Sequence, residues 1–368
     1  KGVDRFILCG MGGSSLAPEV ITQTAGVELV VLDSTDADQI GHALAGDIKR
    51  TAIIVSSKSG STVETDSQKR TFEKAFTDAG IDKTDRVVIV TDPGSPMEAA
   101  AKADGYRIFN ADPTVGGRYS ALTAFGLVPS GLAGADIQAL LDDAREVSAL
   151  LEQDNAANPG LILGAALART ASANGFRDKV GIVGDGTSIV GFGDWAEQLI
   201  AESTGKIGKG ILPVVLDVNS PEIGLDDVVI ARIVADGTVA TGDEIAVAGP
   251  LGAQFLVWEY ATVVASRLIG INPFDQPDVE SAKIAARAML EQRDAEVEPT
   301  FVDGSIEVRS SALSLDGVSD VAGAVAKLLS ELPADGYLSV QAYLDRVDSP
   351  EAAELRDLFA KATRRPVT

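Results

Sequence analysis

The sequence has very few of the residues that build disulfides or histidine-rich sites. It holds one cysteine, Cys9, and one histidine, His42, among 368 residues. A single cysteine excludes a disulfide framework within this sequence and fits a reducing compartment. Cys9 lies in an apolar run, so we expect a small core residue rather than a nucleophile. His42 is expected on the surface of a helix, and a metal site built on histidine and cysteine is not supported.

Basic side chains are also in the minority. The 31 Lys and Arg residues face 54 Asp and Glu residues, which gives a net charge of −23. This balance disfavours nucleic acid and anionic membrane as partners. The longest apolar stretch, from Phe255 to Ile271, contains Glu259 and Arg267 and indicates a buried helix, not a membrane span. We expect a cytoplasmic protein, and an anionic substrate would need a local positive pocket.

Short β-rich runs alternate with helical patterns, which indicates an α/β fold with doubly wound, mainly parallel sheets. In such sheets ligands bind at the carboxyl ends of strands where the strand order reverses. The first block has expected strands at Arg5–Cys9, Glu28–Leu32, Ala52–Val55, Arg86–Thr91 and Arg107–Phe109. The second block has expected strands at Val180–Val183, Ile211–Val215, Val228–Val234 and Glu244–Val247.

Helical patterns occupy most of the intervals between these strands. They are expected at Asp36–Gly46, Tyr119–Val128, Ala135–Glu152, Pro159–Asn174, Val190–Ser203, Pro250–Leu268 and Pro277–Gln292. From Thr300 a strand is followed by a helix (Ser319–Leu332), a strand (Tyr337–Leu344) and a helix (Pro350–Thr363). We therefore expect a first domain at 1–132, a connecting helix at 133–158, a second domain at 159–295 and a small C-terminal α/β unit at 296–368.

The run from Ser57 to Thr65 is the most informative segment. It places five hydroxyls, a lysine and a glycine between an apolar strand and a helical pattern. Ser61 and Glu64 have the spacing of a capping box, which predicts that the helix begins at Ser61. The unpaired N–H groups and the dipole of a helix start form a site for phosphate. A plain cap needs only one hydroxyl, so we predict a phosphorylated ligand held without a metal.

A glycine-rich turn, Gly10–Ser14, follows the first strand. It lacks the G-x-G-x-x-G spacing of dinucleotide sites and the lysine of a P-loop, which argues against NAD and ATP. What remains is a backbone that can approach a ligand closely, with Ser14 as a donor. Arg118 follows Gly116 and Gly117 at a helix start. It is either a solvated hinge residue or a guanidinium placed near charge that develops during a reaction.

Gln198 and Glu202 lie four residues apart in a helical pattern that ends at Gly205, so they share one face. Glu202 falls in the last turn, where the helix dipole disfavours a negative charge. It is either a solvated helix-end residue or a base that shuttles a proton. The run Asn272–Lys283 begins another helix, and by composition alone Lys283 is only a helical lysine.

Together these motifs resemble the phosphoglucose isomerase family, which is built from two sugar-isomerase (SIS) domains. The matching segments, in family order, are Gly10–Ser14, Ser57–Thr65, Val115–Ser120, Glu202–Lys206 and Asn272–Lys283. The resemblance implies two three-layer α/β/α SIS domains with mainly parallel sheets, and a homodimer with shared sites. The sequence is also similar to the isomerase part of actinobacterial transaldolase–isomerase fusions, so a preceding transaldolase domain is one expectation.

The resemblance implies reversible conversion of glucose 6-phosphate into fructose 6-phosphate through a cis-enediol. Glu202 would carry the proton between C2 and C1, and Arg118 would stabilise the enediolate. Gln198 would position the substrate, and Lys283 would assist near the ring oxygen. No metal and no cofactor are implied. The phosphate of the hexose 6-phosphate would be bound by Gly13, Ser14, Ser57, Lys58, Ser59 and Thr62.

The sequence departs from the family at one point. The family uses a histidine, contributed across the dimer, to open the sugar ring, and the corresponding region between Asp226 and Gly252 contains none. His42 lies elsewhere in the sequence. Several alternatives remain for ring opening: Lys283, a hydroxyl, a segment outside this sequence, or spontaneous opening in solution. Two other functions also stay open: a bifunctional phosphoglucose/phosphomannose isomerase, and a non-catalytic SIS protein that binds sugar phosphates.

Overall fold

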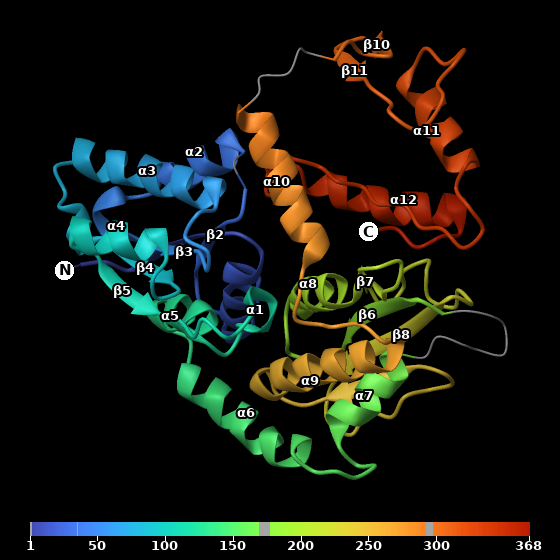
Figure 1. Ribbon diagram of the computed structural model, residues 1–368, viewed down its shortest axis with the longest axis horizontal. Coiled ribbons are helices and arrows are strands. Elements are labelled where there is room, and N and C mark those ends of the chain that lie inside the picture. The colour runs from blue at the N-terminus through green and yellow to red at the C-terminus, as the bar shows by residue number, and fades with distance from the viewer. Residues whose placement is uncertain (1, 35, 169–176, 292–296) are drawn as a thin grey trace.

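The computed structural model describes residues 2–34, 36–168, 177–291 and 297–368, and two sheets with flanking helices dominate it (Figure 1). The first sheet is parallel, with the order β2-β1-β3-β4-β5. All five strands expected for the first block are confirmed. They are β1 (Arg5–Gly10), β2 (Val30–Leu32), β3 (Thr51–Ser56), β4 (Val87–Thr91) and β5 (Arg107–Asn110).

Apolar side chains on both faces of the first sheet bind it to its helices. Ile7 and Cys9 pack with Phe72 on one face, whereas Leu8 packs with Phe125 on the other. Cys9 is fully buried, and burial raises the pKa of its thiol to about 12, which confirms a core role. The helices of this unit are α1 (Leu16–Ala25), α2 (Ala37–Ala45), α3 (Val63–Asp78), α4 (Pro96–Asp104) and α5 (Ala124–Ala133).

The second sheet is also parallel and has the order β7-β6-β8-β9. Its expected strands are confirmed as well. They are β6 (Lys179–Asp185), β7 (Leu212–Leu216), β8 (Val228–Val234) and β9 (Ile245–Ala248). The helices that precede and cover it are α6 (Ile137–Leu151), α7 (Pro159–Leu167), α8 (Phe192–Thr204) and α9 (Leu251–Ile269).

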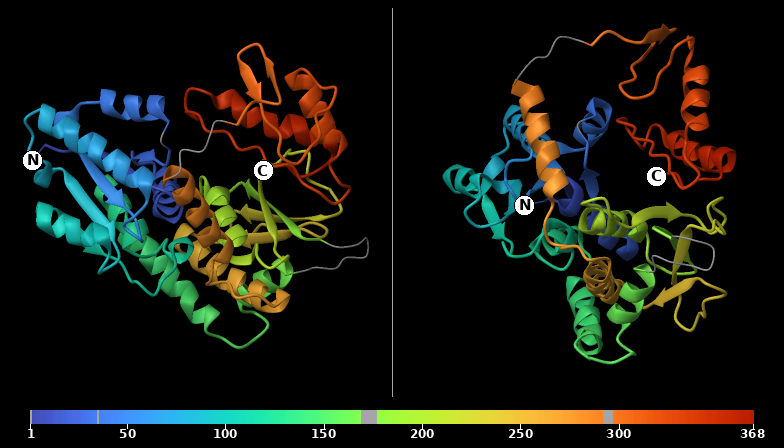
Figure 2. Two further views of the ribbon diagram at one scale, coloured as in Figure 1. Left: turned by 45° about the horizontal axis from the view of Figure 1, so that its top comes forward. Right: turned by 45° about the vertical axis from the view of Figure 1, so that its right-hand side comes forward.

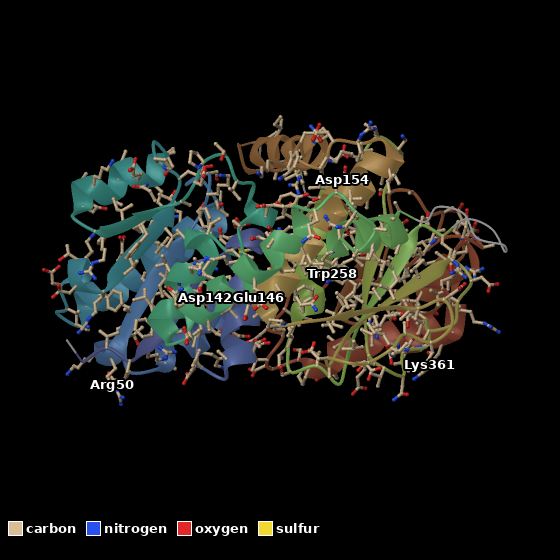
Figure 3. The ribbon with its side chains drawn as sticks, turned by 90° about the horizontal axis from the view of Figure 1, so that it is seen from below. Arg50, Asp142, Glu146, Asp154, Trp258 and Lys361 are labelled. Atoms are coloured by element: carbon tan, nitrogen blue, oxygen red, sulfur yellow. The ribbon has the colours of Figure 1, made fainter. Side chains whose placement is uncertain are left out.

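The expected connecting helix, α6, is packed against α9 rather than standing free. A side chain at Gly252 of α9 would overlap the carbonyl of Leu140 on α6, so the two helices touch through backbone. In the view from below, Asp142 and Glu146 of α6 lie to the left of Trp258 of α9 (Figure 3); the two acidic residues are exposed, whereas Trp258 is fully buried. The segment 133–158 therefore joins the core of the second unit.

The two units share one apolar core. Val20 and Ile21 of α1 belong to the same buried cluster as Trp195 and Leu199 of α8. Burial of this kind is worth roughly 1.5–3 kcal/mol for each large side chain. The shared core therefore sets the position of one sheet relative to the other.

Both sheets contain a point at which the strand order reverses. β2 lies on one side of β1 and β3 on the other, and β7 and β8 flank β6 in the same way. Loops that leave such neighbouring strands diverge at their carboxyl ends, which opens a crevice for ligands. In the first sheet, the loops at this point are the glycine-rich turn after β1 and the hydroxyl-rich loop after β3.

The chain continues after the second sheet into α10 (Pro277–Glu291) and a C-terminal segment, residues 297–368. Figure 2 shows α10 beside the junction of the two units and the C-terminal segment on the side of the second sheet. No helix in the described ranges has the length and apolarity needed to span a membrane. The remaining elements are an antiparallel hairpin of β10 (Phe301–Asp303) and β11 (Ile306–Val308), then α11 (Val321–Ser330) and α12 (Glu354–Thr363).

Three expected elements differ from the structure. The helix expected from Tyr119 begins at Ala124, because Thr123 accepts the N–H of Phe125 at a new helix start. The expected strand at 337–344 is wrong, since only an isolated bridge between Leu338 and Val367 forms there. The helix expected at 159–174 ends at residue 167, and residues 169–174 lie outside the described part. The domain boundaries and the separate C-terminal unit stay predictions.

We expect Gly13→Ala to lower the free energy of unfolding by about 1–3 kcal/mol, as overpacking does. The added Cβ would overlap the backbone carbonyl of Gly117, which cannot swing aside as a flexible side chain can. Gly41→Ala is the matched control, because no heavy atom lies within 4 Å of a Cβ added on this exposed face of α2. It should leave stability unchanged or raise it by up to about 1 kcal/mol. Equal urea midpoints for the two variants would contradict the close approach.

Candidate functional site

The glycine-rich turn after β1 is where the first unit meets the second. It forms a short 3-10 helix, Gly12–Ser14, and Gly12 has a positive φ of 55°. A Cβ on Gly12 would lie only 2.6 Å from Nε2 of Gln198, on α8 of the second unit. The backbone conformation therefore favours glycine here, and a side chain would also displace the end of Gln198. Ser14 is buried at the end of this turn.

The loop after β3 folds its hydroxyls around its own backbone. Ser57 is buried, its hydroxyl lies 3.1 Å from that of Thr62, and it accepts the N–H of Gly60 at 3.1 Å. The hydroxyl of Ser61 donates to Ser59 at 3.1 Å instead of capping a helix. α3 begins only after Thr62, so the capping box predicted at Ser61 is wrong. Thr62 makes no side-chain capping bond, so its side chain does not occupy the N–H groups of the first turn.

Lys58 projects from the same loop toward the ends of the neighbouring strands. Its Nζ donates to Oδ2 of Asp92 at 2.5 Å and to the carbonyl of Pro113 at 3.3 Å. The side chain is 29% exposed, so solvent reaches the ammonium group. An anion bound at the start of α3 would compete with Asp92 for this charge.

Arg118 lies in the 3-10 turn Gly117–Tyr119 and is 2% exposed. Its Nε donates to the hydroxyl of Ser203 at 2.7 Å, and its Nη2 donates to the carbonyls of Pro273 and Asp275. A buried cation must be paired, and these acceptors come from two separate segments of the second unit. Nη1 has no hydrogen-bond acceptor within the described ranges, although it lies 3.6 Å from Oε2 of Glu202.

Glu202 and Gln198 stand together on α8, as their spacing predicts. Nε2 of Gln198 donates to Oε1 of Glu202 at 2.9 Å. The Glu202 side chain is 28% exposed, so one side of its carboxylate faces solvent while the other faces Arg118. A carboxylate beside a guanidinium with a spare donor can take a proton from carbon and leave the resulting oxyanion next to a positive charge.

Sequence reasoning missed two residues that hold this group in place. Besides Ser203, it assigned no role to Lys206, which is buried just beyond α8. Nζ of Lys206 donates to the carbonyl of Asn272 at 2.8 Å and to Oδ1 of Asp275 at 2.8 Å. The hydrogen bond from Lys206 lowers the pKa of the Asp275 carboxyl. A lysine directly after the helix-ending Gly205 could have suggested a buried contact. Its acceptors could not be predicted, because they lie more than sixty residues away in the sequence.

Two further residues were considered in the sequence. Lys283 is exposed on α10. His42 is 57% exposed on α2, as expected, and lies beside Asp345 of the C-terminal segment.

A cavity of about 450 Å³ borders the group on the side of Tyr119, Glu259 and Phe274. The rings of Tyr119 and Phe274 are 5.5 Å apart, and the hydroxyl of Tyr119 lies 2.9 Å from that of Ser203. Burial raises the pKa of the Glu259 carboxyl well above its usual range. A larger cavity, about 870 Å³, lies elsewhere between α8 and the C-terminal segment, so cavity size does not locate this site.

Comparison with known proteins identifies relatives of this chain. The profile of the phosphoglucose isomerase family matches residues 1–213. A probable glucose-6-phosphate isomerase of Haloarcula marismortui is 34% identical over 214 residues, which is 57% of this chain and 49% of that protein. The glucose-6-phosphate isomerase of Trichormus variabilis is 26% identical over 90% of this chain and 74% of that protein. The first of these matches thus spans about half of the relative.

Solved structures show the same fold. A glucose-6-phosphate isomerase from Chlamydia trachomatis superposes with a TM-score of 0.69 over 79% of this chain and 70% of that chain, at 19% identity. The matched family range contains the glycine turn, the hydroxyl loop, Arg118, Gln198 and Glu202, and it ends before Lys283. The α/β fold with mainly parallel sheets is therefore confirmed.

We expect Glu197→Gln to remove a pH-dependent loss of stability. Burial, together with nearby Asp194, raises the pKa of the Glu197 carboxyl from 4.5 to about 7. The folded state thus holds this proton more tightly, so wild-type stability falls as pH rises from about 4.5 to 7 and stays lower above that window. The variant should gain about 1–2 kcal/mol at pH 8, allowing for partial exposure, and nothing at pH 4.

Urea unfolding from pH 4 to 8 measures this difference. Glu146→Gln, an exposed residue on α6, is the matched control and should give a flat difference from wild type. A flat difference for Glu197→Gln as well would show that this carboxyl is not held protonated by the fold.

Proposed function

The chain belongs to the phosphoglucose isomerase family, and we propose on that premise that it interconverts glucose 6-phosphate and fructose 6-phosphate. The observation that carries the proposal is the pairing of Glu202 with Arg118. A partly exposed carboxylate lies 3.6 Å from a buried guanidinium nitrogen that has no hydrogen-bond acceptor in the described part of the chain. A base next to an unused oxyanion donor is what aldose–ketose isomerisation requires.

The proposed phosphate site is formed by the two loops at the strand-order reversal of the first sheet. The substrate phosphate would accept N–H groups at the start of α3 and hydroxyls of the loop after β3. Lys58 would exchange Asp92 for the phosphate as its partner. The six residues assigned to this role are Gly13, Ser14, Ser57, Lys58, Ser59 and Thr62.

The proposed proton transfer runs through Glu202. Its carboxylate removes the proton from C2 of the open-chain aldose, the C2–H electron pair forms the C1–C2 double bond, and O1 takes up the negative charge. Arg118 Nη1 donates to this developing enediolate, a contribution of about 3–4 kcal/mol for one such donor. A proton then passes from O2 to O1, Glu202 returns its proton to C1, and the electron pair left on O2 forms the C2 carbonyl of the ketose. A positioned base of this kind is worth roughly 10²–10⁴-fold. Gln198 holds the carboxylate in place meanwhile.

Three further assignments concern Lys283, the oligomeric state and the cellular location. We assign Lys283 a place near the ring oxygen, a role that requires its side chain to reach the sugar from α10. We also propose a homodimer in the cytoplasm. Two apolar side chains of α10 are exposed, Ile284 at 66% and Met289 at 70%, and a second copy could cover them.

Glu202→Gln should lower kcat by about 10²–10⁴-fold, since the amide cannot accept the proton. Fructose 6-phosphate formation in a coupled assay measures the loss, and calorimetric binding of 6-phosphogluconate should be largely kept. Glu197→Gln, a glutamate five residues earlier on α8, is the matched control and should retain activity. Near-normal turnover in Glu202→Gln would remove it as the base.

The same assay separates the alternatives. Comparable wild-type rates on mannose 6-phosphate and glucose 6-phosphate would indicate the bifunctional isomerase. Binding of hexose phosphate without any turnover would indicate a non-catalytic sugar-phosphate protein.

Ser59→Ala should raise KM for fructose 6-phosphate about 10-fold or more and change kcat little. A hydrogen bond to a charged group is worth about 1.5–3 kcal/mol, and this one is made equally to substrate and transition state. Ser67→Ala is the control, because Ser67 lies further along α3 and donates to the carbonyl of Val63 inside the helix. Equal KM values for both variants would place the phosphate elsewhere.

A further inference from the structure

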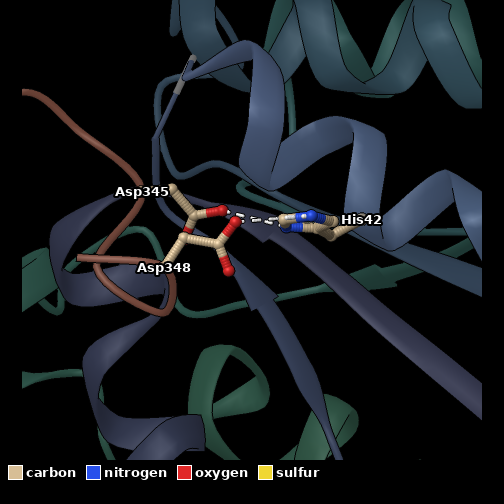
Figure 4. Close-up of side chains that lie close together, drawn as sticks. All are labelled: His42, Asp345 and Asp348. Atoms are coloured by element: carbon tan, nitrogen blue, oxygen red, sulfur yellow. Dashed lines mark hydrogen bonds and ion pairs between the residues drawn. The ribbon is translucent and has the colours of Figure 1, made fainter. Parts of the chain in front are cut away.

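A cluster of three metal-ligating side chains lies away from Glu202, between α2 and the C-terminal segment. Nδ1 of His42 is 3.1 Å from Oδ2 of Asp345, a residue 303 positions away in the sequence. Nε2 of His42 is 3.6 Å from Oδ2 of Asp348. One ligand atom from each of the three residues lies within 4.8 Å of the others. Figure 4 shows both carboxylates facing the imidazole ring.

We propose that His42, Asp345 and Asp348 bind a divalent transition-metal ion, Zn²⁺, which fastens the C-terminal segment to the first unit. Zinc–nitrogen and zinc–oxygen bonds of about 2.0–2.2 Å place tetrahedral ligand atoms roughly 3.3 Å apart. The separation of 3.1 Å between His42 Nδ1 and Asp345 Oδ2 already matches this edge. Asp348 lies 3.6 Å from the other ring nitrogen, Nε2, and its side chain, 61% exposed, would rotate to bring Oδ2 to the third position beside Nδ1. Water would take the fourth.

The carboxylate of Asp345 is oriented for this role. The side chain is only 6% exposed, and its Oδ1 accepts the N–H of Val347 at 2.9 Å. This second contact fixes the carboxylate and leaves Oδ2 directed at His42, as hydrogen bonds to metal ligands do. A nearly buried carboxylate held in this way requires a positive partner.

The nearby arginines are committed to other acceptors. Arg5 and Arg346 line the same cavity, which has a volume of about 450 Å³. Arg346 donates to Oε1 of Glu19 at 2.7 Å, and Arg5 donates to the carbonyl of Ala43 at 2.8 Å. With a neutral imidazole the cluster carries two negative charges, and a divalent ion would balance them.

The ligand set decides which metal fits. One imidazole nitrogen with two carboxylate oxygens suits Zn²⁺ or Mn²⁺, whereas Mg²⁺ and Ca²⁺ prefer sites made of oxygen alone. Because the ion would join α2 to residues 345–348, its effect is on the attachment of the C-terminal segment. Glu202 and Arg118 would be unaffected.

Other histidine or cysteine ligands cannot confuse a Zn²⁺ titration, because His42 is the only histidine in the sequence and Cys9, the only cysteine, is buried. Calorimetric titration of the tag-free chain with ZnCl₂ should give one site with a micromolar Kd. The single imidazole signal in the NMR spectrum should shift at the same stoichiometry. Saturating Zn²⁺ should also raise Tm by a few degrees over the protein in EDTA, and Mg²⁺ should not.

Two variants and a control decide the outcome. His42→Gln and Asp348→Asn should each weaken Zn²⁺ binding at least 10-fold and abolish the Tm rise, with Tm in EDTA close to wild type. Asp335→Asn, exposed elsewhere in the C-terminal segment, should behave as wild type. Zn²⁺ binding that is unchanged in both variants, or absent up to millimolar concentrations, would overturn the proposal. The cluster would then be a plain ion pair between an imidazolium and two carboxylates.

Discussion

The buried guanidinium of Arg118 is the constraint on which the rest of the site depends. A charge that is 2% exposed is tolerated only where acceptors surround it, and these come from Ser203 and from the carbonyls of Pro273 and Asp275. The turn of the first unit is thereby tied to two segments of the second. These contacts occupy Nε and Nη2 and leave Nη1 facing Glu202. The hydrogen bonds that join the two units therefore also orient the guanidinium that would stabilise the proposed enediolate.

Close approach of backbone is what permits that arrangement. A Cβ on Gly13 would overlap the backbone carbonyl of Gly117 within the first unit, and a Cβ on Gly12 would displace the end of the Gln198 side chain from the second unit. Both glycines follow β1, at the reversal of strand order, and the hydroxyl loop follows β3 beside it. A phosphate held at the start of α3 would therefore direct a sugar toward the seam between the sheets, where Glu202 stands. The strand order alone places both loops at the same edge of the first sheet.

Local patterns in the sequence were sufficient for the strands of the two parallel sheets and for the pairing of Gln198 with Glu202. They failed where a partner distant in sequence decides. Ser61 bonds to Ser59 rather than capping α3, and the run 337–344 forms no strand because it finds only the bridge to Val367. Lys206 and Ser203 were overlooked for the same reason, since their acceptors or donors lie in other segments. No spacing rule links His42 to Asp345 either.

The two glutamates of α8 differ in what surrounds them, and this difference decides which of them we propose as the base. Burial, together with nearby Asp194, raises the pKa of the Glu197 carboxyl to about 7, a value suited to proton transfer at neutral pH. The cavity beside Glu197, however, is lined by Arg346 and other residues of the C-terminal segment. Five residues later, Glu202 is turned by about 140° around the helix axis. There it meets Gln198 and the spare donor of Arg118. A base without a neighbouring oxyanion donor would leave the enediolate unstabilised, which is why the proposal assigns the base to Glu202.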